Sequence, residues 1–379
     1  MNIKFIKLFL PAFLMVSFAL LLNSCGDTTT AKEEVDNQET NEVVYPSDVI
    51  PFFDKFKLIL GNGENAGDVT GKAFEGFFYT ENDGENDWVV YKTPNAGNTH
   101  GTSNNTRTEL AQAKKWYPKT SGAKMTATLK VMNVSKTGDA RVAASYSVVV
   151  GQIHSADGHE NEPLKIYYKK FPGHTKGSVF WNYEINTAGD NNDGRWDYSL
   201  PIWGDDFSVV GETPDTYPSE PEDGIALGEE FTYEIDVKDG VMTLKFTSEG
   251  HETKTFTKNL IESEYTTKAD MPEQVQKLFV PIGQDGVERK SAYTGEGLFF
   301  KQGCYNQTNG KDPADNMVWC NGAETHGGDV EKQYETGNYA EVWFKTSEVV
   351  ISDDAISNDE YFSKNDFLYK KLEEEAKKK

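Results

Sequence analysis

Cysteine and histidine are scarce in this chain of 379 residues, which contains three cysteines and six histidines. The histidines are scattered and no Cys-x-x-Cys pair occurs, so the ligand spacing of a structural zinc site is missing. The chain also lacks a G-x-S-x-G nucleophile motif and a phosphate-binding glycine loop. We therefore expect a protein that uses no metal and no other cofactor.

Basic residues are also in short supply, with 38 Lys and Arg against 61 Asp and Glu, and the formal net charge is −23. Nucleic-acid binding requires clustered Lys and Arg, so this balance excludes nucleic acid as a partner. Taken alone, the net charge would disfavour any other polyanion too. The decisive quantity is whether the few cations gather at one site.

Only one long apolar run is present, over residues 8–22, behind Lys4 and Lys7. It is too short to span a bilayer comfortably and predicts a secretory signal peptide over residues 1–24. The following Asn23-Ser24-Cys25 resembles a bacterial lipobox, which predicts lipidation of Cys25. Residues 25–47 are polar and acidic and predict a flexible tether. We expect an outer-membrane lipoprotein that faces the periplasm or the surface and meets the membrane only through its lipid; plain secretion is the alternative.

The two remaining cysteines, Cys304 and Cys320, form an even pair in an oxidising compartment, which favours a disulfide. The bridge would close a loop with 15 intervening residues, a stabilisation of about 3 kcal/mol in the chain-entropy model. The alternative is two free thiols, one of them in the core.

Short strands separated by Gly, Asn and Asp dominate the chain after residue 51. Residues 231–237 and 241–247 flank Asp239-Gly240, the signal of a type I′ hairpin. An all-β fold, a sandwich or jelly roll of antiparallel sheets, is therefore expected over residues 48–352, with a short C-terminal helix in the tail 353–379. Further strands are predicted over residues 124–134, 141–154, 164–170, 178–185, 297–307 and 339–349, and long loops over 201–228 and 308–337.

Three segments carry polar side chains suited to chemistry: Arg107-Thr108-Glu109-Leu110, Gln152-Ile153-His154 and the stretch from Lys301 to Gln307. Strand side chains alternate between faces, so in each segment the residues two apart share a face. Taken singly, each segment has an ordinary explanation: a solvated ion pair, a structural histidine or a packing tyrosine.

Together, R-T-E-L, Q-I-H and K-x-G-x-Y-N-Q resemble the alginate lyases of polysaccharide lyase family 7. The resemblance covers about residues 51–350 and includes residues 53–61, 75–94 and 162–184. It implies a jelly roll of two antiparallel sheets with a concave substrate groove. It also implies a partner, the polyuronate alginate, and we expect the protein to act as a monomer.

The resemblance assigns catalytic roles that suit the residue types. Lyases of this class remove the C5 proton of a uronate and expel the oxygen at C4. Arg107 and Gln152 would neutralise the adjacent carboxylate. Tyr305 would protonate the leaving oxygen, and His154 would be the base or a partner of the tyrosine. Tyrosine can serve as base and acid for mannuronate, whereas His154 would be the base for guluronate.

Substrate contacts are expected from charged and amide side chains on the faces that carry these motifs, although Glu109 is more suited to orienting Arg107 than to touching an acidic sugar. The predicted substrate-binding residues are Glu109, Lys301, Gln307, Lys165 and Lys169.

Finer preferences follow from two weaker signals. In this family Q-I-H accompanies activity on guluronate-containing blocks, so Ile153 favours guluronate. The two long loops favour exolytic action because they would wall off one end of the groove. Two alternatives stay open: a non-catalytic jelly-roll protein that binds carbohydrate, and a lyase for another polyuronate.

Overall fold

The computed structural model describes residues 44–99, 103–119, 122–156, 162–185, 196–261 and 297–357. The predicted signal peptide, Cys25 and the terminal helix predicted over 358–379 lie outside the described residues. The compact unit begins at Val44, slightly before the predicted boundary, because buried Pro46 starts a short helix. Within the described part of the chain, no helix is long and apolar enough to cross a membrane.

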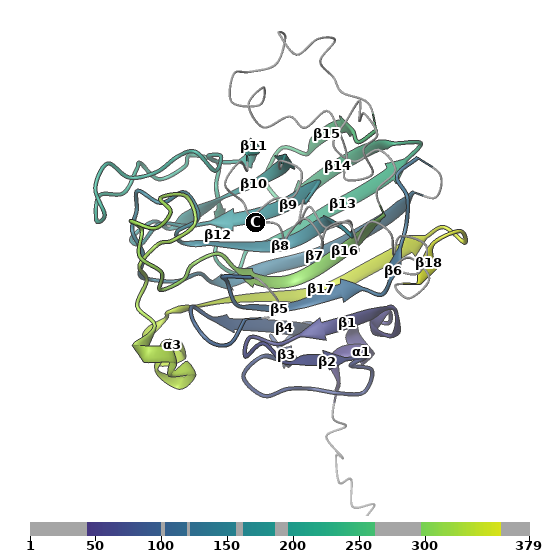
Figure 1. Ribbon diagram of the computed structural model, residues 1–379, viewed down its shortest axis with the longest axis horizontal. Helices are drawn as coiled ribbons and strands as arrows, with labels where there is room; N and C mark the ends of the chain where they lie inside the picture. Colours follow the sequence, from purple (N-terminus) through teal and green to yellow (C-terminus); the bar gives the residue numbers. More distant parts are fainter. Residues whose placement is uncertain are drawn as a thin grey trace, which may run out of the picture. The chain divides into compact units, whose positions relative to one another are not determined.

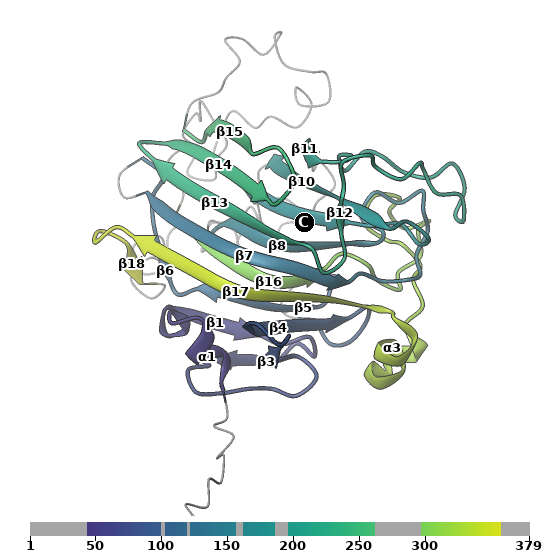
Figure 2. The ribbon, with the colours of Figure 1, turned by 180° about the vertical axis from the view of Figure 1, so that it is seen from behind.

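Two large antiparallel sheets make up this unit (Figures 1 and 2). Sheet A has the strand order β11-β10-β9-β8-β16-β5-β1-β2, and β12 pairs with β10. Its strands are β1 (Phe56–Ile59), β2 (Asn65–Gly67), β5 (Arg107–Gln112), β8 (Ser147–Ser155), β9 (Leu164–Lys169), β10 (Lys176–Ile185), β11 (Trp196–Trp203), β12 (Ile225–Ala226) and β16 (Leu298–Asn306).

Sheet B has the order β15-β14-β13-β7-β17-β4-β3. Its strands are β3 (Phe78–Asn82), β4 (Asp87–Pro94), β7 (Ala123–Asn133), β13 (Glu230–Lys238), β14 (Val241–Ser248), β15 (Lys254–Asn259) and β17 (Tyr339–Ile351). The remaining elements are β6 (Lys114–Lys115) paired with β18 (Ile356–Ser357), the helices α1 (Pro46–Val49) and α3 (Val330–Thr336), and the 3-10 turns η1 (Phe53–Lys55) and η3 (His326–Gly328).

The core lies between the inner faces of the two sheets. Leu110, Ile153 and Phe300 of sheet A and Leu129 and Phe344 of sheet B are buried in one hydrophobic cluster. Because side chains alternate along a strand, the residues next to these in sheet A emerge on its other face. The two-sheet sandwich predicted from the strand pattern is thus confirmed, and the alternation fixes which face carries the polar motifs.

Most predicted strands are present within a few residues of their expected ends. The hairpin between β13 and β14 is confirmed, since Asp239 (φ 51°) and Gly240 (φ 79°) both adopt the positive φ values of a type I′ turn. The strand predicted over 141–154 is too long. It begins only at Ser147, because Tyr146 takes a positive φ of 60° and ends the preceding turns.

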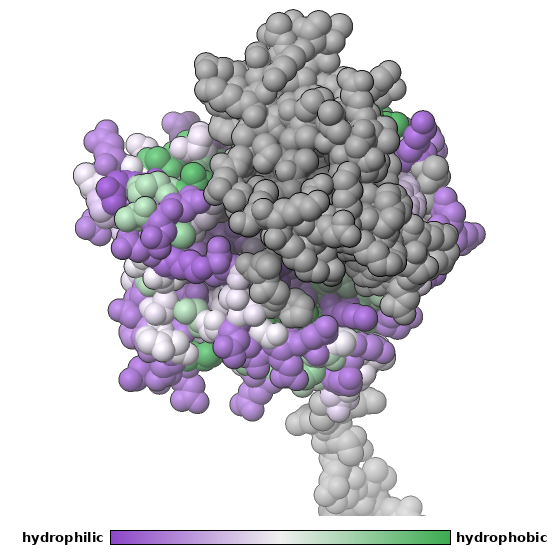
Figure 3. All heavy atoms as spheres, in the orientation of Figure 1, coloured by the Kyte–Doolittle hydropathy of each residue, from purple (hydrophilic) through white to green (hydrophobic). Residues whose placement is uncertain are grey.

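The described residues that are visible in Figure 3 are mostly polar. In this view, hydrophilic side chains cover most of their surface and hydrophobic residues form only small patches. This visible surface agrees with the acidic composition.

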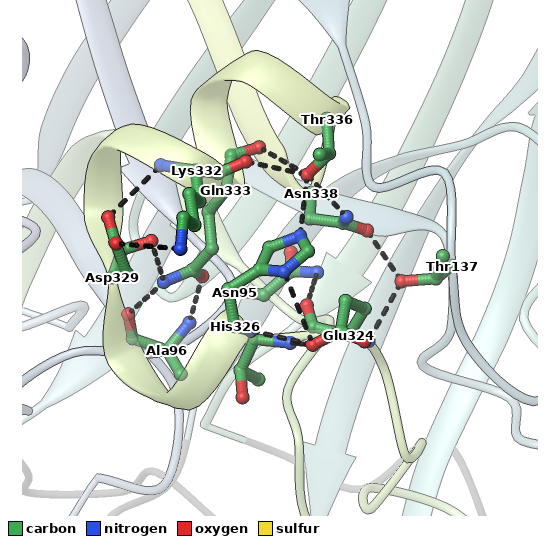
Figure 4. Close-up of polar contacts among 11 residues, drawn as sticks. Asn95, Ala96, Thr137, Glu324, His326, Asp329, Lys332, Gln333, Thr336 and Asn338 are labelled. Carbon is green, nitrogen blue, oxygen red and sulfur yellow. Dashed lines mark hydrogen bonds and ion pairs between the residues drawn. The ribbon is translucent and has the colours of Figure 1, made fainter. Parts of the chain in front are cut away.

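The predicted loop over 308–337 is not structureless, because it contains α3, which is anchored to the end of β4 (Figure 4). Gln333 is fully buried, and its side chain accepts a hydrogen bond from the Ala96 N–H (2.8 Å) and donates one to the Ala96 carbonyl (3.0 Å). Asp329 caps α3 by accepting from the Lys332 N–H at 3.1 Å. The helix thereby holds the chain that leads from β4 towards β5.

Gln333→Ala should destabilise the protein by about 1 kcal/mol, because it leaves the partly buried N–H and C=O of Ala96 without their side-chain partner. Chemical denaturation would measure the loss. Glu335→Ala, an exposed change on the same helix, is the control and should have almost no effect. Equal stability of the two variants would contradict the anchoring role.

The predicted disulfide is wrong, since Cys304 and Cys320 are both free and buried. Cys304 lies in the core between the sheets. Cys320 follows Trp319, whose side chain packs on the opposite face of sheet A with Tyr167 and Phe207. Cys304 thus belongs to the core, whereas Cys320 belongs to the loop that follows β16, and the two thiols are not bonded to each other. Burial raises the pKa of both.

Candidate active site

Arg107 and Gln152 lie side by side on the outer face of sheet A and are held by one carboxylate. Arg107 Nη1 donates to Glu109 Oε2 at 3.1 Å, and Gln152 Nε2 donates to the other oxygen, Oε1. The Arg107 Nε–H and Gln152 Oε1 have no hydrogen-bond partner among the described residues. Glu109 therefore fixes both side chains and leaves the Arg107 Nε–H as a donor suited to an anion such as a uronate carboxylate, whereas Gln152 Oε1 can only accept a hydrogen bond.

Tyr305 lies directly against the Arg107 guanidinium, whose Cζ is 3.7 Å from the centre of the phenol ring. Ser103 joins the two: its Oγ accepts from Arg107 Nη2 at 2.9 Å and is 3.3 Å from the Tyr305 hydroxyl. Burial alone would lower the pKa of Arg107, but the adjacent Tyr305, Glu109 and Glu162 more than offset it, and that pKa is raised. Arg107 is thus a permanent cation beside the phenol.

A bulge in β16 brings Tyr305 to this position. The pairing of β16 with β8 shifts register between Gln302 and Tyr305, and Gly303 between them has a φ of 148°. A Cβ on Gly303 would lie 2.5 Å from the Thr108 carbonyl oxygen, so glycine is required by close backbone approach.

His154 is arranged as a neutral base. Its Nδ1 is 2.6 Å from the Ser155 carbonyl oxygen, which can only accept, so Nδ1 carries the proton and Nε2 keeps its lone pair. Burial and the nearby Lys301 lower the pKa of His154 to about 3, against the opposing effect of Glu162. The Nε2 atom is 3.6 Å from Glu162 Oε1, beyond hydrogen-bond distance.

The predicted lysines do not all reach this site. Lys301 does, with Nζ 3.8 Å from Glu109 Oε2, and its pKa is lowered to about 8 by burial and by Arg107. Lys165 is instead buried and paired with Glu184 and Glu162. Lys169 donates to the carbonyls of Ala143 (2.9 Å) and Val209 (3.0 Å) and lines a separate small pocket. We therefore withdraw Lys165 and Lys169 as substrate contacts.

Gln307 lies just beyond β16 and is buried. Its Nε2 makes a 3.4 Å contact to the Tyr305 carbonyl oxygen, so it supports the backbone of the tyrosine.

An aromatic wall covers sheet A next to Tyr305; we use this name for Tyr167, Phe180, Phe207 and Trp319. The rings of Tyr167 and Phe180 stack on the sheet (4.9 Å), and Phe207 lies 5.6 Å from Tyr167. Trp319 stacks on Phe207 at 5.3 Å. Phe207 and Trp319 come from the two segments predicted as long loops, so those segments meet beside Tyr305.

Sequence reasoning missed three residues of this region. Ser103 and Glu162 lie outside regular strands and gave no periodic signal. Phe299 shares the alternation of Lys301 and Tyr305 and could have been found: its ring centre is 5.0 Å from that of His154.

The sandwich fold and this set of guanidinium, amide, imidazole and phenol groups define a polysaccharide lyase. A family model described as alginate lyase matches residues 51–350, most of the chain. The chain belongs to this family, the alginate lyases of polysaccharide lyase family 7.

Individual relatives agree. The structure of the exolytic family 7 alginate lyase AlyA5 from Zobellia galactanivorans is 61% identical, with a TM-score of 0.75, over 82% of this chain and 98% of that one. An alginate lyase structure from Klebsiella pneumoniae, 21% identical with a TM-score of 0.54 over 79% of this chain and 98% of that one, shares the fold. A curated alginate lyase from Klebsiella pneumoniae is 29% identical over 195 residues. The match covers 50% of this chain and 50% of that relative, so the chain spans about half the length of the curated relative.

Proposed function

We propose that this protein cleaves alginate by β-elimination and leaves a 4-deoxy unsaturated uronate at the new end. The base takes the C5 proton, and the electron pair of the broken C5–H bond forms the C4–C5 double bond. The bond between C4 and the glycosidic oxygen breaks as that oxygen gains a proton. The observation that carries the proposal is the convergence of Arg107, Gln152, His154 and Tyr305 on one face of sheet A.

Each group has a definite task in this reaction. Arg107 and Gln152, fixed by Glu109, would receive the uronate carboxylate and stabilise the charge that develops as the C5 proton leaves. The Tyr305 hydroxyl would protonate the departing oxygen. A protein that only binds carbohydrate would need no neutral imidazole and no phenol beside Arg107 and Gln152, the groups that would bind the uronate carboxylate.

Ultraviolet absorbance of the unsaturated product tests the proposal directly. Purified protein mixed with alginate should give a steady rise. Absence of product from mannuronate-rich, guluronate-rich and mixed alginate alike would overturn it and favour a binding protein. Product from a different polyuronate alone would favour a lyase for that polyuronate.

A preference for guluronate-containing blocks is part of the proposal. It is supported by the free lone pair on His154 Nε2, because guluronate requires a base distinct from the acid. Ile153 is buried in the core between the sheets and contributes no contact at the site, so its sequence signal has no physical mechanism here. Initial rates on pure mannuronate and guluronate blocks measure the preference.

Exolytic action is also proposed, since the aromatic wall covers the sheet face immediately beside Tyr305. A polymer crossing the catalytic residues could not continue over this part of sheet A, so the chain end would be bound there. The 61% identical relative is described as exolytic, which supports the same mode.

Trp319→Ala combined with Phe207→Ala should open the wall and shift early products from the shortest oligomers towards medium lengths. Chromatography of products at low conversion would measure the shift. Val350→Ala on sheet B, an exposed change, is the control. An unchanged product profile in a folded double variant would contradict the role of the wall.

A further inference from the structure

Three lysines gather on sheet A beyond His154, on the side away from the aromatic wall. Lys57 of β1 and Lys301 of β16 are the two cross-strand partners of Ala111 on β5. The side chains of Lys57, Ala111 and Lys301 therefore share one face, with the small alanine between the two lysines. Lys115 of β6 joins them: its Nζ lies 3.4 Å from the ring centre of Phe299, and Lys301 Nζ lies 5.8 Å from the same centre. We call Lys57, Lys115 and Lys301 the lysine cluster.

Lys115 is the unusual member. Lys115 is only 3% exposed. Within the described residues its ammonium group makes one hydrogen bond, a long contact of 3.5 Å to the Gln112 carbonyl oxygen. An ammonium group has three donors, so two find no partner among the described residues. No carboxylate of the described chain pairs with it, and its charged neighbours are Lys301 and Lys57.

This arrangement is costly unless an anion arrives. Burial, and then the like charges of Lys301 and Lys57, lower the pKa of Lys115 to about 7. A buried cation without a counter-ion destabilises the fold, and the Phe299 ring compensates only in part. Packing alone would favour an apolar side chain at this position.

We propose that Lys115, together with Lys57 and Lys301, forms a second carboxylate-binding subsite, which takes a uronate unit of the same alginate chain next to the unit held by Arg107 and Gln152. The inference rests on the proposed function. The geometry fits, because His154 and Lys301 both flank Phe299, so the subsite adjoins the catalytic groups. The exposed Lys57 opens the cluster towards solvent on the β1 side.

Binding should be measured in the Tyr305→Phe background, where no turnover interferes, with a guluronate tetramer and isothermal titration. Lys115→Met should raise Kd by about tenfold at low salt, and the dependence of Kd on salt should weaken. Lys114→Met is the matched control: this lysine is the preceding residue of the same strand, carries the same charge and is exposed, so its loss should leave Kd unchanged. Lys115→Arg should keep Kd within about threefold of the parent.

Two further readouts separate a binding role from a structural one. A tetramer whose carboxylates are reduced to alcohols should bind equally to the Lys115 and Lys115→Met proteins. The thermal midpoint should stay level or rise in Lys115→Met, since a buried unpaired charge is removed.

Equal Kd values for Lys115→Met and Lys114→Met with the charged tetramer would overturn the subsite while wild-type cleavage of alginate leaves the proposed function standing. A lowered midpoint with a loss of binding that Lys115→Arg does not restore would also overturn it. Absence of both product from the wild type and tetramer binding would remove the proposed function and the subsite together.

Discussion

Tyr305→Phe is expected to lower kcat on alginate by at least about 10³-fold while changing the affinity for oligomers by less than about threefold. The change removes one oxygen, so the phenyl ring can still stack on the Arg107 guanidinium. What is lost is the proton donor for the leaving oxygen. On the proposed mechanism the same oxygen would also be the base in mannuronate cleavage, so no block type should escape the loss.

Steady-state absorbance assays would give kcat, and titration with oligomers would give the affinity. Tyr79→Phe removes a hydroxyl from β3 of sheet B and should leave both values unchanged. Full activity of Tyr305→Phe would remove the assigned acid. A large loss of affinity with kcat retained would instead mean that the hydroxyl binds substrate through its bridge to Ser103.

The strand alternation in the sequence was enough to predict the sandwich and which polar residues share a face within each motif. Period-two patterns are strong when one face is buried, as in β16, where Phe300, Gln302 and Cys304 turn inwards and Lys301 and Tyr305 outwards. Alternation also separated Ile153 from its neighbours Gln152 and His154. These results depend only on contacts within a strand and its nearest partners.

Predictions that depended on distant partners were less successful. Lys165 and Lys169 have the expected facing on β9, but Glu184 and two backbone carbonyls hold their ammonium groups. The cysteine pair failed for the same reason, because spacing along the chain does not reveal whether two thiols lie close enough to bond. The charge argument was refined in the same way: Arg107 and the lysine cluster supply local cations in a chain whose total is −23.

His154→Gln should separate the two block types. We expect guluronate turnover to fall by about 10²- to 10³-fold and mannuronate turnover by less than about tenfold, because only the anti elimination needs a base on the imidazole side. Glutamine preserves polarity and approximate size but offers no basic nitrogen. His326→Gln, on the loop before α3, is the control and should alter neither rate.

The pH profile gives an independent test of the same assignment. A pKa of about 3 keeps His154 neutral, so the free enzyme should show no acid limb near pH 6.5 in kcat/KM on guluronate blocks. An imidazole with an ordinary pKa would lose its base as the pH falls through 6.5, and kcat/KM would fall tenfold for each further pH unit. A fall in kcat/KM below pH 6.5 that disappears in His154→Gln would show that the pKa of His154 is near its ordinary value. That result would contradict the lowering of this pKa by burial and Lys301. Equal losses on both block types would mean that His154 acts through Tyr305 rather than on the C5 proton of guluronate.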